Sequence, residues 1–419
     1  MCQQLGQKIA HEAFAIVRRI EFMVERVMFF QPRTYAGRNY MNSFGAEQTW
    51  TPWFALTLAP VAAKLRLAVE LVDARVSSDW AARIETLSET DLLAVTVMTG
   101  NAIRDAIDAS EIARDRVATV VWGGPHVSLF PKETAREAPA DVVVPGFGYR
   151  PFGKLLQQLQ TSGLPKDRIV TASCDDVVAI EKSAPKRPAM FDAVNIDLIH
   201  NWGPYLNADV AIASRTANLV TSEGCSRKCT YCSEPTTSSG EWLTADVALA
   251  VQVAQAVQAR SQANGFKLHD PNFFDSIERA TAFASTFFAK LNLPWAATMH
   301  PADLTCLTEN QIRQFADYGL SRVLVGLESP DPKLVKLAGK QYDPTQIPEL
   351  ARKLAAAHVR GMFTFIVGWP GADPKHYEET VECAKDILGI CLNRHPGVPA
   401  FPIPKGHEIY DPIAETLGI

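Results

Sequence analysis

Short apolar runs alternate with amphipathic stretches in two blocks of the chain. In the first block, from about residue 25 to 165, runs of strand length end at Gly, Pro or Asp, and stretches with a helical period follow them. Continuous apolar strands that alternate with helices predict a parallel sheet covered on both faces, which is a doubly wound, Rossmann-like α/β fold. We expect strands at Arg26–Gln31, Leu67–Val72, Leu92–Met98, Ala118–Trp122 and Asp141–Val144, and helices at Thr57–Arg66, Ala102–Arg114 and Tyr149–Leu159.

The second block begins with a strand at Leu219–Ser222 and repeats the alternation to about residue 404. Its five or six β/α units predict an open, partial (β/α)6 version of the (β/α)8 barrel, with chemistry on the loops after the strands. Thr244 is the expected N-cap of the first helix. We expect further strands at Gly265–His269, Trp295–Met299, Arg322–Leu327, Met362–Gly368 and Pro399–Pro404, and helices at Thr244–Ala263, Ser276–Leu291, Glu309–Tyr318, Pro332–Leu337, Thr345–His358 and Lys375–Cys391.

These patterns divide the chain of 419 residues into four segments. Residues 1–25 read as an amphipathic helix, residues 26–165 as the Rossmann-like domain, residues 166–212 as a linker with poor periodicity, and residues 213–419 as the partial barrel. The net charge of −5 gives no electrostatic case for nucleic-acid binding, and the longest apolar runs are too short to span a membrane. The N-terminus lacks the pattern of a signal peptide, so we expect a cytoplasmic protein.

Three cysteines lie within eight residues of the second block. Cys225, Cys229 and Cys232 have the spacing C-x3-C-x2-C, with Tyr231 just before the last one. Structural zinc sites use four ligands, often in two separated pairs, whereas cysteine thiolates also ligate iron–sulfur clusters. Because no fourth cysteine follows nearby, a cuboidal cluster on these thiolates would keep one iron open. The spacing favours a [4Fe–4S] cluster; zinc and structural thiols are the alternatives.

The cysteine motif and the strand ends that follow it resemble the radical S-adenosylmethionine (SAM) enzymes, in which SAM chelates the open iron. The resemblance covers about residues 213 to 404 and extends to Leu268–Phe274, Val325–Ser329 and Phe365–Gly371. It implies that Tyr231 stacks near the adenine of SAM and that the methionine, ribose and adenine parts are contacted by Asp270, Glu328, Ser329, Val367 and Gly368.

The first block resembles the cobalamin-binding domain that is fused to one large class of radical SAM enzymes. Val121–Ser128, with its Gly-Gly-Pro-His turn, and Asp141–Gly148 carry this resemblance. The cobalamin contacts that it implies come from Thr99, Gly123, Gly124, His126, Val127, Gly146 and Gly148. The Asp-x-His-x-x-Gly motif that supplies a histidine to cobalt is absent, and Phe147 and Tyr149 replace two glutamates of the family's Gly-Glu-Gly-Glu loop. We interpret His126 as a structural residue of the turn, so that cobalamin would bind without a histidine below the metal.

Together the two resemblances imply a cobalamin-dependent radical SAM methyltransferase. In that class a 5′-deoxyadenosyl radical removes hydrogen from an unactivated carbon, which then receives a methyl group that passes from SAM through methylcobalamin. The expected partners are a small-molecule substrate and an external electron donor of the flavodoxin or ferredoxin type. An oxidative cyclase, a radical SAM enzyme whose first domain lacks cobalamin, and a non-catalytic corrinoid- or redox-sensing protein remain alternatives. The sequence identifies neither the substrate nor a catalytic residue.

Several other side chains have two interpretations each. Trp50 and Trp53 lie either along the corrin or substrate or in the packed interior. Arg227 and Lys228 either favour reduction of a cluster or are exposed loop charges. His269 and His300 end adjacent strands, where we favour hydrogen-bonded structural roles over proton transfer.

Overall fold

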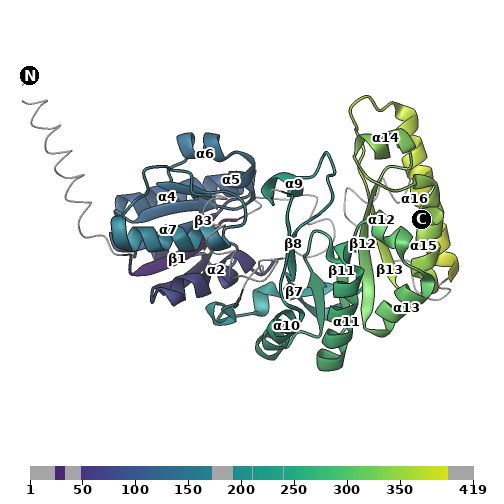
Figure 1. The fold of residues 1–419 in the computed structure, drawn as a ribbon, viewed down its shortest axis with the longest axis horizontal. Helices are drawn as coiled ribbons and strands as arrows, with labels where there is room; N and C mark the ends of the chain where they lie inside the picture. Colours follow the sequence, from purple (N-terminus) through teal and green to yellow (C-terminus); the bar gives the residue numbers. More distant parts are fainter. Residues whose placement is uncertain (1–23, 34–48, 172–191, 210, 239, 395–419) are drawn as a thin grey trace, which may run out of the picture. The chain divides into compact units, whose positions relative to one another are not determined.

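The structure is a computed structural model that describes residues 24–33, 49–171, 192–209, 211–238 and 240–394. These residues form two compact units, each built on a mainly parallel sheet (Figure 1). The first unit holds described residues 24–33 and 52–200, and the second holds residues 49–51 and those from 201 on. Residues up to 23 of the predicted N-terminal helix and the sixth strand predicted at Pro399–Pro404 lie outside the described residues. No helix in the described ranges is both long and apolar enough to cross a membrane.

The first sheet has five parallel strands in the order β2-β1-β3-β4-β5. This is the flavodoxin-like variant of the doubly wound fold, in which the order of strand addition reverses between β1 and β3 while all strands stay parallel. The loops that follow these two strands therefore flank the place where ligands of such sheets bind. The strands are β1 (Arg26–Gln31), β2 (Ala68–Asp73), β3 (Asp91–Thr96), β4 (Thr119–Gly123) and β5 (Val142–Val144).

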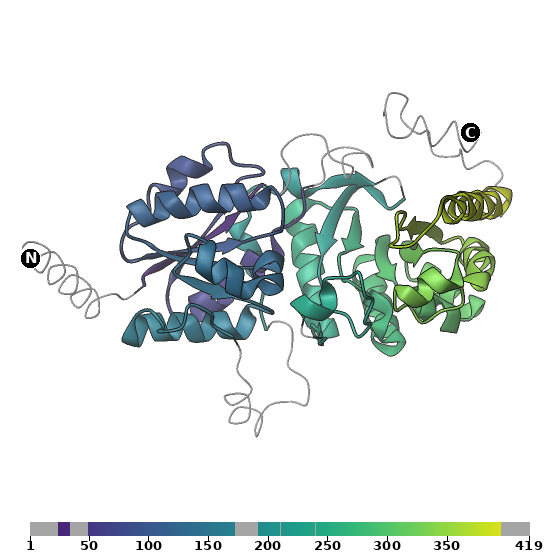
Figure 2. The same cartoon turned by 90° about the horizontal axis from the view of Figure 1, so that it is seen from above.

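Helices cover both faces of this sheet (Figures 1 and 2). Alternate residues of β1 show the two layers: Met28 and Phe30 join the core beneath α4, whereas Val27 and Phe29 join the core with α2 and α7. The predicted doubly wound architecture is confirmed. The helices are α2 (Trp53–Lys64), α3 (Trp80–Ile84), α4 (Ala102–Asp115), α5 (Pro125–Leu129), α6 (Pro131–Glu137) and α7 (Tyr149–Ser162).

The second sheet curls into a half-barrel with the strand order β13-β12-β11-β10-β7-β6. All neighbours are parallel except β6, which pairs antiparallel with β7 at the edge. Three of the residues predicted as linker therefore belong to this sheet. The strands are β6 (Asn207–Asp209), β7 (Ala213–Leu219), β10 (Gly265–Leu268), β11 (Trp295–Met299), β12 (Leu320–Glu328) and β13 (Arg360–Phe365).

The outer face of the half-barrel packs on helices. Phe266 of β10 lies 5.5 Å from Phe287 of α11, measured between ring centroids, and Trp295 of β11 lies 6.3 Å from Phe283. Because side chains alternate along a strand, the residues next to these aromatics point to the inner face. The elements after each strand are α9 (Glu234–Thr237), α10 (Val247–Ser261), η4 (Phe273–Asp275), α11 (Ile277–Leu291), α12 (Pro301–Cys306), α13 (Glu309–Asp317), α14 (Pro332–Leu337), η5 (Pro344–Gln346), α15 (Ile347–Ala356) and α16 (Pro374–Arg394).

The entry into the cysteine loop differs from the prediction. The barrel strand ends at Leu219, and a separate strand, β8 (Ser222–Gly224), pairs antiparallel with β9 (Trp242–Thr244). Thr244 therefore lies in a strand, and the N-cap of α10 is Asp246, whose carboxylate accepts hydrogen bonds from the N–H groups of Ala248 and Leu249. The sequence did not reveal this hairpin because its strands are three residues long and only partly apolar.

The β8–β9 hairpin predicts a contrast between two glycines with positive φ. A Cβ on Gly224 (φ 77°) would overlap the carbonyl oxygen of Glu241, whereas a Cβ on Gly240 (φ 73°) would meet nothing within 4 Å. We expect Gly224→Ala to lower the free energy of unfolding by about 2–4 kcal/mol, and Gly240→Ala by about 1 kcal/mol. Urea unfolding of the iron-free protein measures both, and equal losses would contradict the steric explanation.

Candidate active site

The three cysteines of the motif lie on one loop between β8 and α9. Cys229 is buried, Cys225 and Cys232 are half-buried, and all three are free thiols. Burial raises the pKa of each thiol, that of Cys225 to about 11. Binding of a metal centre here must therefore displace protons from thiols that otherwise stay neutral.

One side of this loop is fastened to the end of α14. The Thr230 N–H donates to the carbonyl oxygen of Ala338 at 3.0 Å, and the Thr230 hydroxyl donates to that of Leu337 at 2.9 Å. Gly339 has φ 68°, and a Cβ there would lie 3.1 Å from the carbonyl oxygen of Lys228. The backbone after α14 thus fixes the middle of the cysteine loop.

The other side of the loop is fastened by acidic groups from the next two strand ends. The Ser226 hydroxyl donates to Asp275 at 2.6 Å, and Arg227 forms an ion pair with Asp303. Asn272 links these carboxylates, because its amide donates to Asp303 at 2.8 Å and to Asp275 at 3.2 Å. Arg227 is therefore a half-buried, paired side chain, whereas Lys228 is exposed.

Tyr231, which is itself exposed, joins a network with the buried side chains of Glu328 and Lys340. The Tyr231 hydroxyl donates to Glu328 at 2.7 Å, and the Lys340 ammonium lies 2.9 Å from the same carboxylate oxygen. Burial, and then the Glu328 carboxylate, raise the pKa of Tyr231. Glu328 has φ 69°, and a Cβ on Gly326 would collide with its carboxylate. Lys340, which the sequence did not single out, ties β12 to the cysteine loop.

Asp270 has its hydrogen bonds satisfied within the protein. One carboxylate oxygen accepts from the Thr221 N–H at 2.7 Å, and the other accepts from the hydroxyls of Thr221 and Ser222 at 2.6 and 2.7 Å. Burial raises the pKa of this carboxyl, although the hydrogen bonds oppose the shift. Asp270 therefore holds the turn that leads into β8.

The other predicted SAM contacts lie at the carboxyl ends of β12 and β13. Ser329 is buried and its hydroxyl accepts from the Asp331 N–H at 3.1 Å, so its side chain shapes the turn after β12. Val367 is 55% exposed, and Gly368 has φ 79° with open space where a Cβ would be. The structure thus brings the β12 and β13 ends together at one edge of the half-barrel.

Buried donors without acceptors are present in this region. Within the described residues, the Nε of Arg227, the Nε2 of His300 and the indole Nε1 of Trp369 have no hydrogen-bond partner. His300 accepts from the Ala302 N–H through Nδ1, so Nε2 carries its proton, and burial lowers the pKa of His300 to about 3. An anionic group with sulfur or oxygen acceptors fits such donors. Among the described residues, no three His, Cys, Asp or Glu side chains converge on a single metal ion.

In the first unit the Gly-Gly turn closes the carboxyl end of β4. Gly124 has φ 93°, and a Cβ there would lie 2.7 Å from the Thr96 hydroxyl and 2.9 Å from the Val97 nitrogen. The turn therefore needs glycine because a side chain would collide with the neighbouring strand. The resemblance gives Gly124 another role, as a contact of cobalamin. A Cβ on Gly123 would lie 3.4 Å from the Val144 carbonyl oxygen. Val127 is fully buried, and its side chain belongs to the core on one face of the sheet.

Two hydrogen-bonded pairs join the remaining loops of this edge. Thr99 Oγ1 lies 3.1 Å from His126 Nδ1, and the His126 ring packs 5.4 Å from that of Phe130. Ser128 ends the Val121–Ser128 motif but was not among the predicted cobalamin contacts. It donates to the Gly124 carbonyl and accepts from the Gly146 N–H at 2.9 Å. Gly146 has φ 74°, and Gly148 is the N-cap of α7.

The tryptophans and the first strand-end histidine also have definite places. Trp53 is buried in α2. The Trp50 ring lies 4.2 Å from that of His269, measured between centroids, and His269 Nε2 forms a 2.6 Å hydrogen bond with Asn218 Oδ1. Both histidines, His269 and His300, thus have structural hydrogen bonds, as the sequence interpretation favoured.

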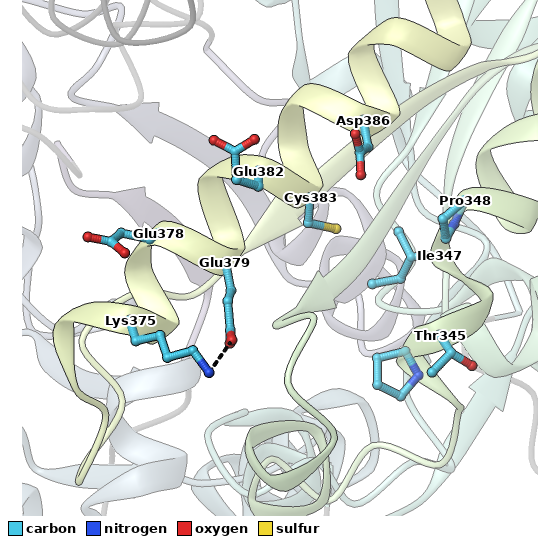
Figure 3. Close-up of a pocket in the computed structure, with 10 residues that line it drawn as sticks. Thr345, Ile347, Pro348, Lys375, Glu378, Glu379, Glu382, Cys383 and Asp386 are labelled. Carbon is cyan, nitrogen blue, oxygen red and sulfur yellow. Dashed lines mark ion pairs between the residues drawn. The ribbon is translucent and has the colours of Figure 1, made fainter.

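A pocket of about 510 Å³ lies away from these residues, between the start of α15 and α16 (Figure 3). Its wall on α16 is acidic, with Glu378, Glu382 and Asp386, and a 3.2 Å ion pair joins Lys375 to Glu379. None of the predicted site residues lines it.

The Glu328–Lys340 pair predicts strong coupling in a double-mutant cycle. Both side chains are less than 10% exposed, so either single substitution leaves one buried charge without its partner. We expect Glu328→Gln or Lys340→Met to cost about 3–5 kcal/mol, and the double variant to cost less than the sum. Glu349→Gln, which removes an exposed pair with Arg352, should cost under about 0.5 kcal/mol. Additive losses in urea unfolding would refute the coupling.

Comparison with known proteins identifies one part of the chain directly. Residues 219–384 match the family model of the radical SAM superfamily. This range includes the cysteine loop, Tyr231, Glu328 and Lys340.

Two kinds of curated relative are similar in sequence. An uncharacterized methyltransferase of Pyrococcus horikoshii is 24% identical over 310 residues, which are 73% of this chain and 66% of that protein. The tRNA-2-methylthio-N(6)-dimethylallyladenosine synthase of Escherichia coli is 24% identical over 44% of this chain and 42% of its own length. The chain thus spans under two thirds of the length of each of these relatives.

Solved structures show the fold of nearly the whole chain. The radical SAM methyltransferase TsrM from Kitasatospora setae, with cobalamin and a [4Fe–4S] cluster bound, matches with a TM-score of 0.67 and 16% identity over 87% of this chain and 74% of its own. OxsB, a cobalamin-dependent SAM radical enzyme with aqua-cobalamin and SAM bound, matches with a TM-score of 0.66 and 14% identity over 86% of this chain and 52% of its own. Residues 219–384 are a radical SAM domain, and the chain has the fold of the cobalamin-dependent radical SAM enzymes.

Proposed function

We propose that this protein is a cobalamin-dependent radical SAM methyltransferase that methylates a carbon atom of a small molecule. The observation that carries the proposal is the cysteine loop: three free thiols, fastened on both sides at the carboxyl edge of a half-barrel, next to buried donors that lack acceptors. Similarity to a protein named as a methyltransferase and to the fold of TsrM supports the same reaction class.

Different residues of the chain would hold the cluster and SAM. Cys225, Cys229 and Cys232 would each bind one iron of a [4Fe–4S] cluster. Arg227 and His300 offer N–H groups to the anionic cluster or to a carboxylate of SAM. When bound, the cluster, SAM and cobalamin supply reductive cleavage of SAM, a carbon radical and a transferable methyl group.

The residues predicted to contact SAM fall into two groups by their surroundings. Val367 and Gly368 are exposed and open, as expected of residues that line an adenine site. The second group already has hydrogen-bond partners within the protein; it consists of Asp270, Ser329, Glu328 and Tyr231. We propose that these side chains hold the loops around SAM. They bind SAM directly only if one of their present hydrogen bonds is replaced by a hydrogen bond to SAM.

For cobalamin, we propose that the corrin lies over the loops after β3, β4 and β5. Thr99 and His126 are joined to each other there, and Ser128 braces the Gly124 and Gly146 turns. The Gly123, Gly146 and Gly148 backbone and the exposed Met98 side chain complete this edge. Val127 contributes only its backbone.

The substrate and partners follow from the same comparison. TsrM has been solved with a tryptophan substrate, which supports a small molecule here. The relatives that act on tRNA match less than half of this chain, and the net charge of −5 does not favour nucleic acid. We further propose a reducing, cytoplasmic setting with an external electron donor of the flavodoxin or ferredoxin type, because the cluster needs an electron and the thiols must stay reduced.

The cluster proposal predicts a specific loss of iron. After anaerobic reconstitution with iron and sulfide, wild-type protein should hold about four iron atoms per chain, and Cys229→Ala should lose most of them. Cys306→Ala, which removes an exposed free thiol outside the loop, is the matched control and should keep its iron. Iron analysis and the cluster's visible absorption measure both, and equal iron in the two variants would reject the assigned ligands.

The reaction is tested on the same reconstituted protein with hydroxocobalamin, a reductant and SAM. Methyl transfer should yield 5′-deoxyadenosine together with S-adenosylhomocysteine, and a product heavier by one methylene. A product that has lost hydrogens would instead indicate the oxidative cyclase, and failure to cleave SAM would indicate a sensing protein.

The cobalt is predicted to lack a nitrogen ligand from this chain. The Asp-x-His-x-x-Gly motif is absent and the His126 ring is packed on Phe130, so we expect His126 to add no nitrogen hyperfine splitting to the electron paramagnetic resonance spectrum of the Co(II) form. His126→Ala should leave that spectrum unchanged. Nitrogen splitting that disappears in the variant would show that His126 is a ligand.

A further inference from the structure

Lys267 is a cation on the inner face of the half-barrel. Its neighbours along β10, Phe266 and Leu268, are buried against the helices, so Lys267 points the other way. In the strand register it stands beside Asn218 of β7 on one side and Ala296 of β11 on the other. Side chains aligned in this way across parallel strands share one face of the sheet.

This ammonium has no anionic partner in the described part of the chain. It forms neither a hydrogen bond nor an ion pair there, and burial lowers its pKa. The Asp209 carboxylate is close enough to interact electrostatically with Lys267. Asp209 is, however, already paired with Arg322, whose guanidinium nitrogen lies 2.8 Å from a carboxylate oxygen. Arg322 is aligned with Lys267 across the sheet, through Ala296 of the strand between them. The two aligned cations, Lys267 and Arg322, thus share one nearby carboxylate, which is paired with Arg322. A desolvated charge without a partner is costly.

Asn218 adds an unused donor beside Lys267. Asn218 is 3% exposed, and its amide nitrogen has no hydrogen-bond partner among the residues that the structure describes. Its oxygen is occupied by His269 Nε2. Burial, and then the charges of Lys267 and Arg322, lower the pKa of His269 to about 3, so this ring is neutral and adds no positive charge. A buried amide N–H and an ammonium therefore both lack an acceptor at neighbouring positions.

Trp50 provides an apolar wall next to these donors. Its ring is 37% exposed, lies 4.2 Å from the His269 ring and is 5.8 Å from the Lys267 ammonium. The contact with the indole face stabilises the ammonium in part, but it supplies no hydrogen-bond acceptor. A flat apolar group that carries an anion would satisfy all three side chains at once.

We propose that Lys267 and Asn218 bind a carboxylate of the substrate on the inner face of the half-barrel, with the Trp50 indole packed on the adjacent apolar part. The proposal rests on the proposed function and narrows its substrate to a small carboxylic acid. The ammonium and the amide N–H both donate to the carboxylate oxygens, so the charge of Lys267 is neutralised only when the substrate is bound.

The test compares acids with their uncharged amides on full-length protein. Benzoate, indole-3-acetate and L-tryptophan are each titrated against the matching primary amide by calorimetry, with reconstituted and with iron-free protein. We expect at least one acid to bind wild-type protein about tenfold tighter than its amide. Lys267→Met should abolish that preference, and Lys290→Met, which removes an exposed lysine at the end of α11, should retain it.

Three outcomes would overturn the proposal. They are the absence of any preference for an acid in wild-type protein, a preference that survives in Lys267→Met, and a fall in the unfolding temperature of Lys267→Met of more than about 5 °C, which would mean that Lys267 is structural. Removal of an unpaired buried charge should instead leave that temperature the same or higher.

SAM also carries a carboxylate, so its affinity is measured in parallel. Equal SAM affinity in wild type and Lys267→Met assigns the site to substrate, whereas a tenfold loss assigns it to SAM and rejects the substrate site. Since acid binding is measured without turnover, failure of the protein to cleave SAM would reject the proposed function and leave this result standing.

Discussion

The buried ion pair between Glu328 and Lys340 joins the parts of the half-barrel on which the site depends. Glu328 ends β12 in a left-handed conformation, Lys340 follows α14, and the Tyr231 hydroxyl brings the cysteine loop to the same carboxylate. Burial of two charges is repaid only when their remaining hydrogen bonds are satisfied. Here Lys340 also donates to the Gly326 carbonyl, and Tyr231 donates to Glu328. A buried pair of this kind specifies one arrangement of three chain segments and tolerates few others.

The carboxyl edge of the half-barrel, around the cysteine loop, has side chains that would bind an anionic group. The cysteine thiols have raised pKa values, while the Nε of Arg227 and the Nε2 of His300 are donors without acceptors in the described part of the chain. Neither feature favours the ligand-free state, because unsatisfied buried donors cost stability and the raised pKa values disfavour thiolates. Both become favourable when deprotonated thiolates and an anionic centre lie among them. The arrangement is therefore understandable as a site whose stability is completed by its ligand.

The sequence predicted the elements with strong periodicity and missed those defined by tertiary pairing. β11 and α14 have the predicted bounds, and α4 differs by one residue. The β8–β9 hairpin, the edge strand β6 and the short helices α3, α5 and α12 have too few residues for a period to show. Site residues followed the same rule: cysteine spacing located the loop, but Lys340 and Ser128 act through contacts with distant segments, and no spacing encodes those.

One signal for the inner face was present in the sequence. A parallel strand buried on both sides is a continuous apolar run, and β4 is of this kind up to Trp122. In β10 the run is broken at alternate positions, by Lys267 and then His269 just beyond the strand, and Asn218 breaks β7 at the aligned position. Alternate polar residues in a strand that should be wholly apolar point to one face, and in a half-barrel covered by helices that face is the interior. Polar groups placed there cost folding energy, so their presence is better explained by what binds them than by what they stabilise.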